Sequence, residues 1–229
     1  AKDRVQGSRS NGADAPSPAP IIHHPDVKRM LLDMKCIAEA GRCLTLYAAY
    51  CIDLSKRHAD APTRQRFSDR LSLMTPVVKA WITDRAIECA STGIQVHGGL
   101  GYIEDTGAAQ HLRDARIMAI YEGTNGIQAN DLIGRKIVRE AGTSVLGLIS
   151  DMKEDMAGAK ALDGEALEVI LRATRQSIHD LESAVDWILG SASHDPDGIA
   201  AGATAFLKLS GNAICGWLMA KCAIEAQNL

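Results

Sequence analysis

Aromatic side chains are scarce in this 229-residue sequence, where Phe, Trp and Tyr make up 4% of the residues against 46% for hydrophobic residues as a whole. The apolar content is aliphatic and rich in alanine, with few of the Val, Ile, Thr, Tyr and Phe alternations that fill β-sheets. This composition excludes an all-β fold and predicts that most of the chain is helical.

The sequence also lacks an excess of positive charge and long apolar runs. Lys and Arg number 25 against 28 for Asp and Glu, for a net charge of −3, so no basic field exists to attract nucleic acid. No apolar run reaches the roughly 20 residues of a membrane span, and no hydrophobic stretch follows the basic residues of the N-terminal segment. We therefore expect a cytoplasmic protein that neither binds nucleic acid nor spans a membrane.

The six cysteines form no CxxC pair, and no Cys/His spacing typical of a zinc site is present. Cys36, Cys43 and Cys51 recur at intervals of seven and eight residues, which places them on one stripe of a helix. Free thiols in such a stripe behave as small hydrophobes. We expect buried, reduced cysteines and no metal site. Walker-type lysine, HExxH and GxSxG motifs are also absent, which removes the common alternatives.

Apolar residues follow the 3.6-residue helical period along most of the chain. The expected helices cover residues 25–58, 63–75, 76–96, 108–121, 127–141, 145–160, 165–188 and 199–229. Pro76 predicts a break or kink after Thr75, because proline lacks the N–H that a helix interior requires. The Gly-, Ser-, Ala- and Pro-rich segment 7–20 is expected to be an exposed loop. Residues 1–6 resemble the last turn of a longer element, and the last helix has no stop signal, so we expect a fragment.

Three glycines, Gly98, Gly99 and Gly101, follow the helix expected at 76–96. A dinucleotide-binding fingerprint follows a strand, opens a helix and contains a third glycine at a set distance, none of which applies here. Two interpretations remain open: the glycines end the helix in a tight turn, or they allow the backbone to approach a ligand closely.

Glu122 is the strongest candidate for a chemical role. It lies between an apolar helix end and the polar loop 123–126. A carboxylate there could face a pocket while its own N–H and the next one stay free. Partial burial would raise its pKa from about 4.3 toward the range of a general base, and the free amides could hold an enolate oxygen. The alternative is an ordinary charge at a helix end.

Three linked motifs resemble the C-terminal helical domain of the acyl-CoA dehydrogenases: QVHGGLGY at 95–102, HLRDAR at 111–116 and IYEGTNGIQ at 120–128. The resemblance covers about residues 1–142. Residues 143–229 resemble the additional C-terminal region of a larger subfamily that includes methylthiopropanoyl-CoA dehydrogenases. The implied fold is all-α: an up-and-down helical bundle over 1–142, then an additional helical domain over 143–229 that is expected to be truncated in this sequence.

The resemblance implies FAD-dependent α,β-dehydrogenation of an acyl-CoA thioester to a trans-2-enoyl-CoA, with the hydride passing to N5 of FAD. It further implies a homodimer or homotetramer that shares flavin sites between subunits and is reoxidised by an electron-transferring flavoprotein. The family's N-terminal helical and middle β-domains are missing, so the fragment alone is expected to be inactive. The alternative is a non-catalytic helical module for interaction or oligomerisation.

The resemblance also assigns roles to single residues. Glu122 would be the catalytic base, its N–H would polarise the thioester carbonyl, and Tyr121 and Gly123 would line the acyl pocket. Thr124 and Asn125 would contact the flavin of their own subunit. The remaining FAD contacts, made to the cofactor of a neighbouring subunit, would come from Arg4, Gln6, Gln95, Val96, His97, Gly98 and Gly99. Gly126 departs from the family pattern, because many members carry a polar flavin contact there.

Overall fold

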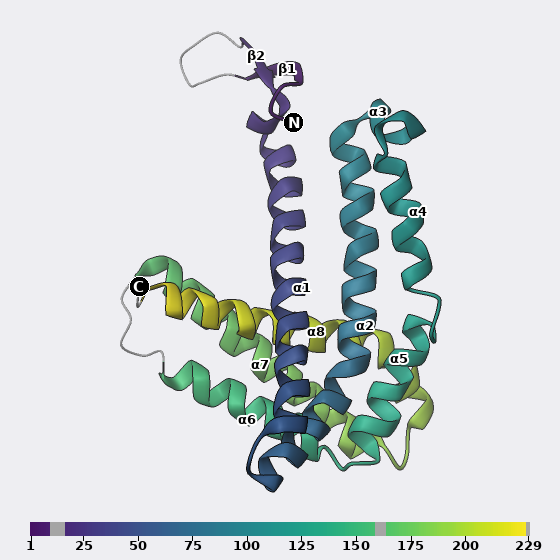
Figure 1. The fold of residues 1–229 in the computed structure, drawn as a ribbon, viewed down its shortest axis with the longest axis vertical. Helices are drawn as coiled ribbons and strands as arrows, with labels where there is room; N and C mark the ends of the chain where they lie inside the picture. The colour runs from purple at the N-terminus through teal and green to yellow at the C-terminus, as the bar shows by residue number, and fades with distance from the viewer. Residues whose placement is uncertain (10–16, 159–163, 228–229) are drawn as a thin grey trace. The chain divides into compact units, whose positions relative to one another are not determined.

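The computed structural model describes residues 1–9, 17–158 and 164–227 (Figure 1). Apart from one small sheet, the regular secondary structure in these ranges is helical. The predicted all-α class is therefore confirmed. None of the described helices combines the length and the apolarity needed to cross a bilayer.

The N-terminal segment forms a short antiparallel pair of strands, β1 (Val5–Arg9) and β2 (Ser17–Pro20). This corrects the loop expected at 7–20, of which residues 10–16 lie outside the described residues. Residues 5 and 6, expected to belong to the last turn of a longer element, are part of β1. Nearly all side chains of the pair are exposed. The pairing thus depends on main-chain hydrogen bonds, which leave no apolar pattern in the sequence. A 3-10 turn, η1 (Ile21–His23), leads into the first long helix.

Two long helices follow, α1 (Pro25–Arg57) and α2 (Ala61–His97). The break expected at Pro76 does not occur, because α2 continues through this residue. The hydroxyl of Thr75 donates to the carbonyl of Leu71 at 2.8 Å, which satisfies one main-chain acceptor of the preceding turn. Pro76 itself is buried with its neighbour Val77. Packing of this face therefore outweighs the local cost of proline.

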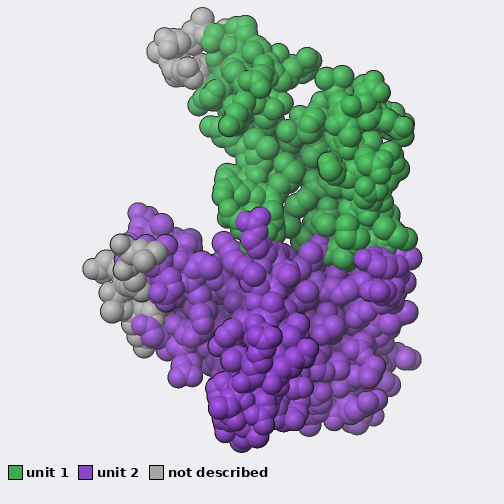
Figure 2. Space-filling view, in the orientation of Figure 1, with its two compact units in different colours: residues 1–39, 83–118 green, residues 40–82, 119–229 purple. Residues whose placement is uncertain are grey.

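The chain divides into two compact units (Figure 2), and each unit contains part of α1 and part of α2. Unit 1 consists of residues 1–39 and 83–118, and unit 2 of residues 40–82 and 119–229. Unit 2 contains residues from both sides of the domain boundary predicted at 142/143, and that boundary stays a prediction. Each unit is described by itself below.

Besides β1, β2 and η1, unit 1 contains the first part of α1, the last part of α2 and three further elements: α3 (Gly99–Tyr102), η2 (Glu104–Thr106) and α4 (Ala108–Met118). None of residues 25–39 is buried. Cys36 is consequently exposed, which corrects the burial predicted for it, whereas Cys51 in unit 2 is buried. All six cysteines are free thiols.

Unit 2 adds five helical elements to the inner parts of α1 and α2: α5 (Asn125–Asp131), the π-helical segment η3 (Leu132–Val138), α6 (Thr143–Gly158), α7 (Glu165–Ser191) and α8 (Pro196–Gln227). Helix α7 buries one regular apolar stripe, as its sequence period predicts. The core of this unit includes Leu44, Met74, Ile137, Leu148, Met152, Ile178, Leu181, Val185, Phe206, Ile214 and Trp217.

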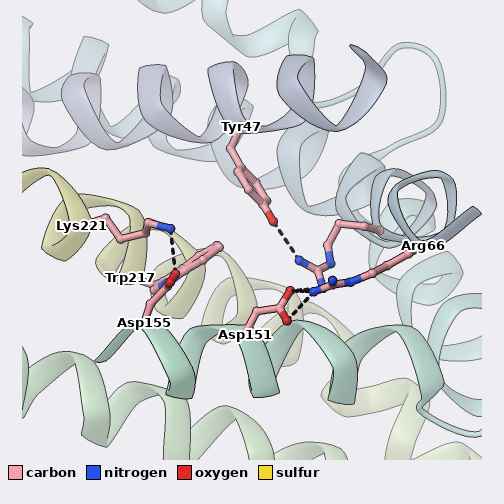
Figure 3. Close-up of polar contacts among 7 residues, drawn as sticks. Tyr47, Arg66, Asp151, Asp155, Trp217 and Lys221 are labelled. Carbon is pink, nitrogen blue, oxygen red and sulfur yellow. Dashed lines mark hydrogen bonds and ion pairs between the residues drawn. The ribbon is translucent and has the colours of Figure 1, made fainter. Parts of the chain in front are cut away.

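Polar contacts tie α6 to α1 and α2 on one side (Figure 3). The Arg70 guanidinium donates to the Tyr47 hydroxyl and to the Asp151 carboxylate, both at 2.8 Å. Arg66 donates to the same carboxylate at 2.5 Å. Asp151 lies on α6, so residues 143–158 are bound directly to the two long helices.

On the other side, α6 contacts α8. The carboxylate of Asp155 accepts from the indole N–H of Trp217 at 2.9 Å and from the ammonium of Lys221 at 2.8 Å (Figure 3). The Trp217 ring also packs edge-on against Tyr47 of α1, with ring centroids 5.2 Å apart. The C-terminal helices are therefore integral to unit 2.

Candidate active site

The segment that carries Glu122 leads into α5 through a sharp change of backbone direction. Glu122 has φ +54° and Gly123 has φ +86°, so two consecutive residues lie in the left-handed region. Thr124 then caps α5, since its hydroxyl accepts from the N–H of Ile127 at 3.3 Å. A non-glycine residue in this conformation costs about 1 kcal/mol. Such strain is frequent at functional sites.

The turn is anchored on α2. The ammonium of Lys79 donates to the Gly123 carbonyl at 2.8 Å and to the Asn125 side-chain oxygen at 2.7 Å. The Asn125 amide in turn donates to the Ala80 carbonyl at 3.2 Å, and its main-chain N–H donates to Ala119 at 3.1 Å. Sequence reasoning missed Lys79. The available signal was a lysine beside the buried positions of α2 at 76, 77, 80 and 81.

The N–H groups of Glu122 and Gly123 donate to no acceptor within the described part of the chain. The Glu122 carbonyl, by contrast, accepts from the Gln128 side chain at 3.3 Å. This leaves two adjacent amide donors beside one carboxylate. Such a pair can stabilise an oxygen that gains negative charge.

The structure corrects one expectation about Glu122. Partial burial was expected, but the side chain is exposed, because none of the described residues covers it. Three apolar neighbours in unit 2 are exposed as well: Ile120 at 46%, Tyr121 at 51% and Ile127 at 58%. The Glu122 carboxylate thus lies among apolar side chains but is open to solvent. The described residues do not exclude water from it.

The glycine turn lies in unit 1, and its geometry supports the interpretation that the glycines end the helix in a tight turn. Helix α2 ends at His97, and Gly98, with φ +65°, turns the chain into α3. A Cβ added at Gly101 would lie 2.4 Å from the Ile94 carbonyl oxygen, so this glycine permits close packing. A Cβ at Gly98 or Gly99 would meet no atom within 4 Å. The main chain at those two glycines therefore has open space beside it, and its contact with a ligand stays a prediction.

The other predicted cofactor residues divide between the two units. Arg4 and Gln6 are exposed in unit 1, where their carbonyls accept from the Ile21 N–H and interact with the His24 ring, both at 2.8 Å. Gln95 and His97 are exposed and Val96 is half-buried in the same unit, whereas Thr124 and Asn125 belong to unit 2. In the described ranges, no group of three or more His, Cys, Asp or Glu side chains is arranged to hold a metal ion.

The fold is all-α, with the turn that carries Glu122 in one unit and the glycine turn at 98–101 in the other. Residues 13–137 match the family described as acyl-CoA dehydrogenase, C-terminal domain, and residues 148–229 match the family described as acetyl-CoA dehydrogenase C-terminal like. The first match covers more than half of the chain. The chain therefore belongs to the acyl-CoA dehydrogenase family, whose members are FAD flavoproteins of fatty acid metabolism.

Relatives agree with this placement. The chain is 40% identical over 227 residues to the 3-methylmercaptopropionyl-CoA dehydrogenase of Ruegeria pomeroyi, which covers 99% of this chain and 38% of that protein. It is 35% identical over 186 residues to a butyryl-CoA dehydrogenase of Syntrophomonas wolfei, covering 80% of this chain and 30% of the relative. The chain thus spans well under half the length of these relatives.

One solved structure shows the same fold. Caenorhabditis elegans ACDH-11, determined in complex with C11-CoA, superposes with a TM-score of 0.71 at 23% identity over 88% of this chain and 34% of that chain. The family inferred from the three sequence motifs is confirmed. The roles of individual site residues stay predictions.

Proposed function

We propose that this chain supplies the base-bearing helical part of an FAD-dependent acyl-CoA dehydrogenase, which converts an acyl-CoA thioester to a trans-2-enoyl-CoA. The observation that carries the proposal is the turn at Glu122, where a carboxylate lies beside two free N–H groups. Its position in the IYEGTNGIQ segment of a chain that belongs to this family supports the same role.

The chemistry requires removal of a weakly acidic proton next to the thioester carbonyl. The Glu122 carboxylate accepts this α-proton, and its own N–H donates to the carbonyl oxygen, where charge builds up. Tyr121 and Gly123 flank the base and would line the acyl pocket. Exposed Ile120 and Ile127 provide apolar surface that an acyl chain or a covering domain can dehydrate. Loss of water would strengthen both the base and the hydrogen bond to the oxygen.

FAD, when bound, supplies the oxidised ring that accepts the β-hydride. The open main chain at Gly98 and Gly99 fits close approach of a cofactor, and Gln95, Val96 and His97 precede it on α2. Arg4 offers a guanidinium suited to a pyrophosphate, with Gln6 beside it in the sequence.

Thr124 and Asn125 are assigned to the flavin of the same subunit. The Thr124 hydroxyl accepts one hydrogen bond in capping α5, which leaves its proton to donate. The wider proposal is a cytoplasmic homodimer or homotetramer with flavin sites shared between subunits and an electron-transferring flavoprotein as acceptor.

Glu122→Gln in the complete enzyme tests the proposal. We expect the variant to keep its FAD and to reduce it with acyl-CoA at least about 100-fold more slowly, because a general base contributes about 10²- to 10⁴-fold. Stopped-flow absorbance of the flavin measures the rate. Glu154→Gln changes an exposed carboxylate on α6 and should leave the rate unchanged. Parental reduction by Glu122→Gln would place the base elsewhere. A complete protein that binds no flavin would favour the non-catalytic module.

A further inference from the structure

We infer that Lys79 is a positioning residue for the turn that carries Glu122, an inference that rests on the proposed function. Lys79 lies on α2, 44 residues before Gly123, and its ammonium bonds to the two sides of the turn. One bond reaches the Gly123 carbonyl and the other reaches the Asn125 side chain, so a single cation holds the residues that immediately follow the base.

The turn needs such a restraint. A left-handed conformation at Glu122 persists only where the surroundings over-determine it, since a non-glycine residue prefers other backbone angles. Bonds from an ammonium are stronger than those between neutral groups, and both distances are short. The Asn125 amide extends the restraint by donating to Ala80, one residue after Lys79. The main chain of Gly123 and the side chain of Asn125 are thereby fixed to the same turn of α2.

Lys79 acts through the turn and has no assigned contact with substrate. Its effect should therefore fall on the rate of proton abstraction, because small displacements of a base are costly once the substrate is bound. A tie that only held the fold together would change stability without changing the orientation of the base. The two cases can be separated experimentally.

The chain offers a matched control in Lys136. This lysine is also partly buried in unit 2, and its ammonium donates to the Ser72 hydroxyl of α2 at 2.6 Å. It ties η3 to α2 but makes no bond to the turn at 122–125. Lys79→Met removes a lysine of α2 that bonds to the turn, whereas Lys136→Met removes a lysine of η3 that bonds to α2. Only Lys79→Met is expected to loosen the turn that carries Glu122.

The experiment uses the complete FAD-loaded enzyme. We expect Lys79→Met to lower the limiting rate of flavin reduction by acyl-CoA about 10- to 100-fold. The apparent dissociation constant for acyl-CoA should change less than about threefold. Lys136→Met should stay within about twofold of the parent rate. Lys79→Arg, which keeps a charged donor, should recover part of the loss. If Lys79→Met does not fold, Lys79→Gln carries the same comparison.

Amide hydrogen exchange supplies a readout independent of turnover. In peptides that cover residues 119–128, Lys79→Met should exchange faster than the parent and Lys136→Met should not. Equal rates of flavin reduction in the two lysine variants, or unchanged exchange in this segment for Lys79→Met, would overturn the inference. If Glu122→Gln is inactive while the two lysine variants behave alike, only the role of Lys79 fails. If Glu122→Gln is fully active, the proposed function fails first.

Discussion

Arg70 is the most deeply buried charged residue among the described residues of unit 2, with 3% of its side chain exposed. A buried charge is tolerated only when it is paired and hydrogen-bonded, and Arg70 meets this condition through Tyr47 and Asp151. Burial raises the pKa of Tyr47 to about 12, so its hydroxyl stays neutral and accepts from the guanidinium. This residue cluster holds α6 against α1 and α2.

Asp151→Asn should therefore be strongly destabilising at neutral pH. The substitution leaves Arg70 buried without its counter-charge, and breaking a buried pair in this way costs about 3–5 kcal/mol. Because Asp151 keeps some solvent contact and Arg66 can partly reorient, we expect about 3 kcal/mol. Urea unfolding followed by circular dichroism measures the loss. Asp180→Asn on the exposed face of α7 should stay within about 0.5 kcal/mol of the parent, and an equal loss there would contradict the assignment.

The ion pair between Arg70 and Asp151 predicts that the free energy of unfolding depends on pH. Burial by itself would raise the pKa of Asp151, but the hydrogen bonds and charges of Arg70 and Arg66 together hold it below its ordinary value. Its contribution is fully present above the unfolded pKa of about 3.9 and is lost as the pH falls through the lower folded value. The stability gap between parent and Asp151→Asn should thus narrow below about pH 4. A gap that stays constant between pH 7 and pH 3 would show that the charge of Asp151 is not its source.

Local sequence was sufficient to single out Glu122 as a candidate, because the apolar helix end and the polar, glycine-flanked loop lie next to it in the chain. The resemblance of segment 120–128 to the family then gave it an expected role. Local sequence was not sufficient to find Lys79 or Arg70. Their partners lie 23 to 81 residues away, and no periodic pattern identifies which distant hydroxyl, carbonyl or carboxylate will pair with a given cation.

At the scale of elements, the corner between α2 and α3 contains one glycine in close packing contact, Gly101, and one with open space beside it, Gly99. Gly101→Ala would place its Cβ against the Ile94 carbonyl, so we expect a loss of about 1–3 kcal/mol in stability. Gly99→Ala meets no neighbouring atom and should be neutral to slightly stabilising. If the proposed cofactor contact is correct, Gly99→Ala also weakens FAD binding, whereas its effect on stability stays small. Thermal unfolding together with flavin content measures both effects. The reverse pattern would exclude this division of roles.

Helix positions were largely predictable from hydrophobic period and capping residues, as α7 illustrates. Two elements were not. The β1–β2 pair is held by main-chain hydrogen bonds between exposed residues, and α2 runs through Pro76 because tertiary packing of Pro76 and Val77 compensates the local penalty. In both cases the deciding interaction is absent from the local pattern of side chains.

At the scale of the whole molecule, α8 packs on α2 through a point of very close approach. A Cβ at Gly211 would lie 2.2 Å from Cδ1 of Trp81, and the Trp81 indole N–H donates to the neighbouring Asn212 at 2.9 Å. The glycine allows the helix backbone to lie directly on the indole. Residues 143–229 therefore help to build the unit that also contains the Glu122 turn.

Gly211→Ala should force α8 away from Trp81 and lower the free energy of unfolding by about 2–3 kcal/mol. Gly216 lies on the same helix, and an added methyl there meets no atom within 4 Å. Gly216→Ala should therefore raise the free energy of unfolding by about 0.5–1 kcal/mol. Thermal or chemical unfolding distinguishes the two. Similar effects from both alanines would indicate that helix propensity, and not contact with Trp81, governs this part of α8.

The sequence by itself determined the all-α class, the places of most helices, the family and the position of the candidate base, because these depend on residues that are neighbours in the chain. Tertiary structure decided the rest: the two compact units, the hydrogen bonds of Lys79 and Arg70, the packing of α8 on Trp81 and the exposure of Glu122. These features depend on which distant surfaces meet, and burial and hydrogen bonding between residues far apart in sequence are settled only when the helices pack.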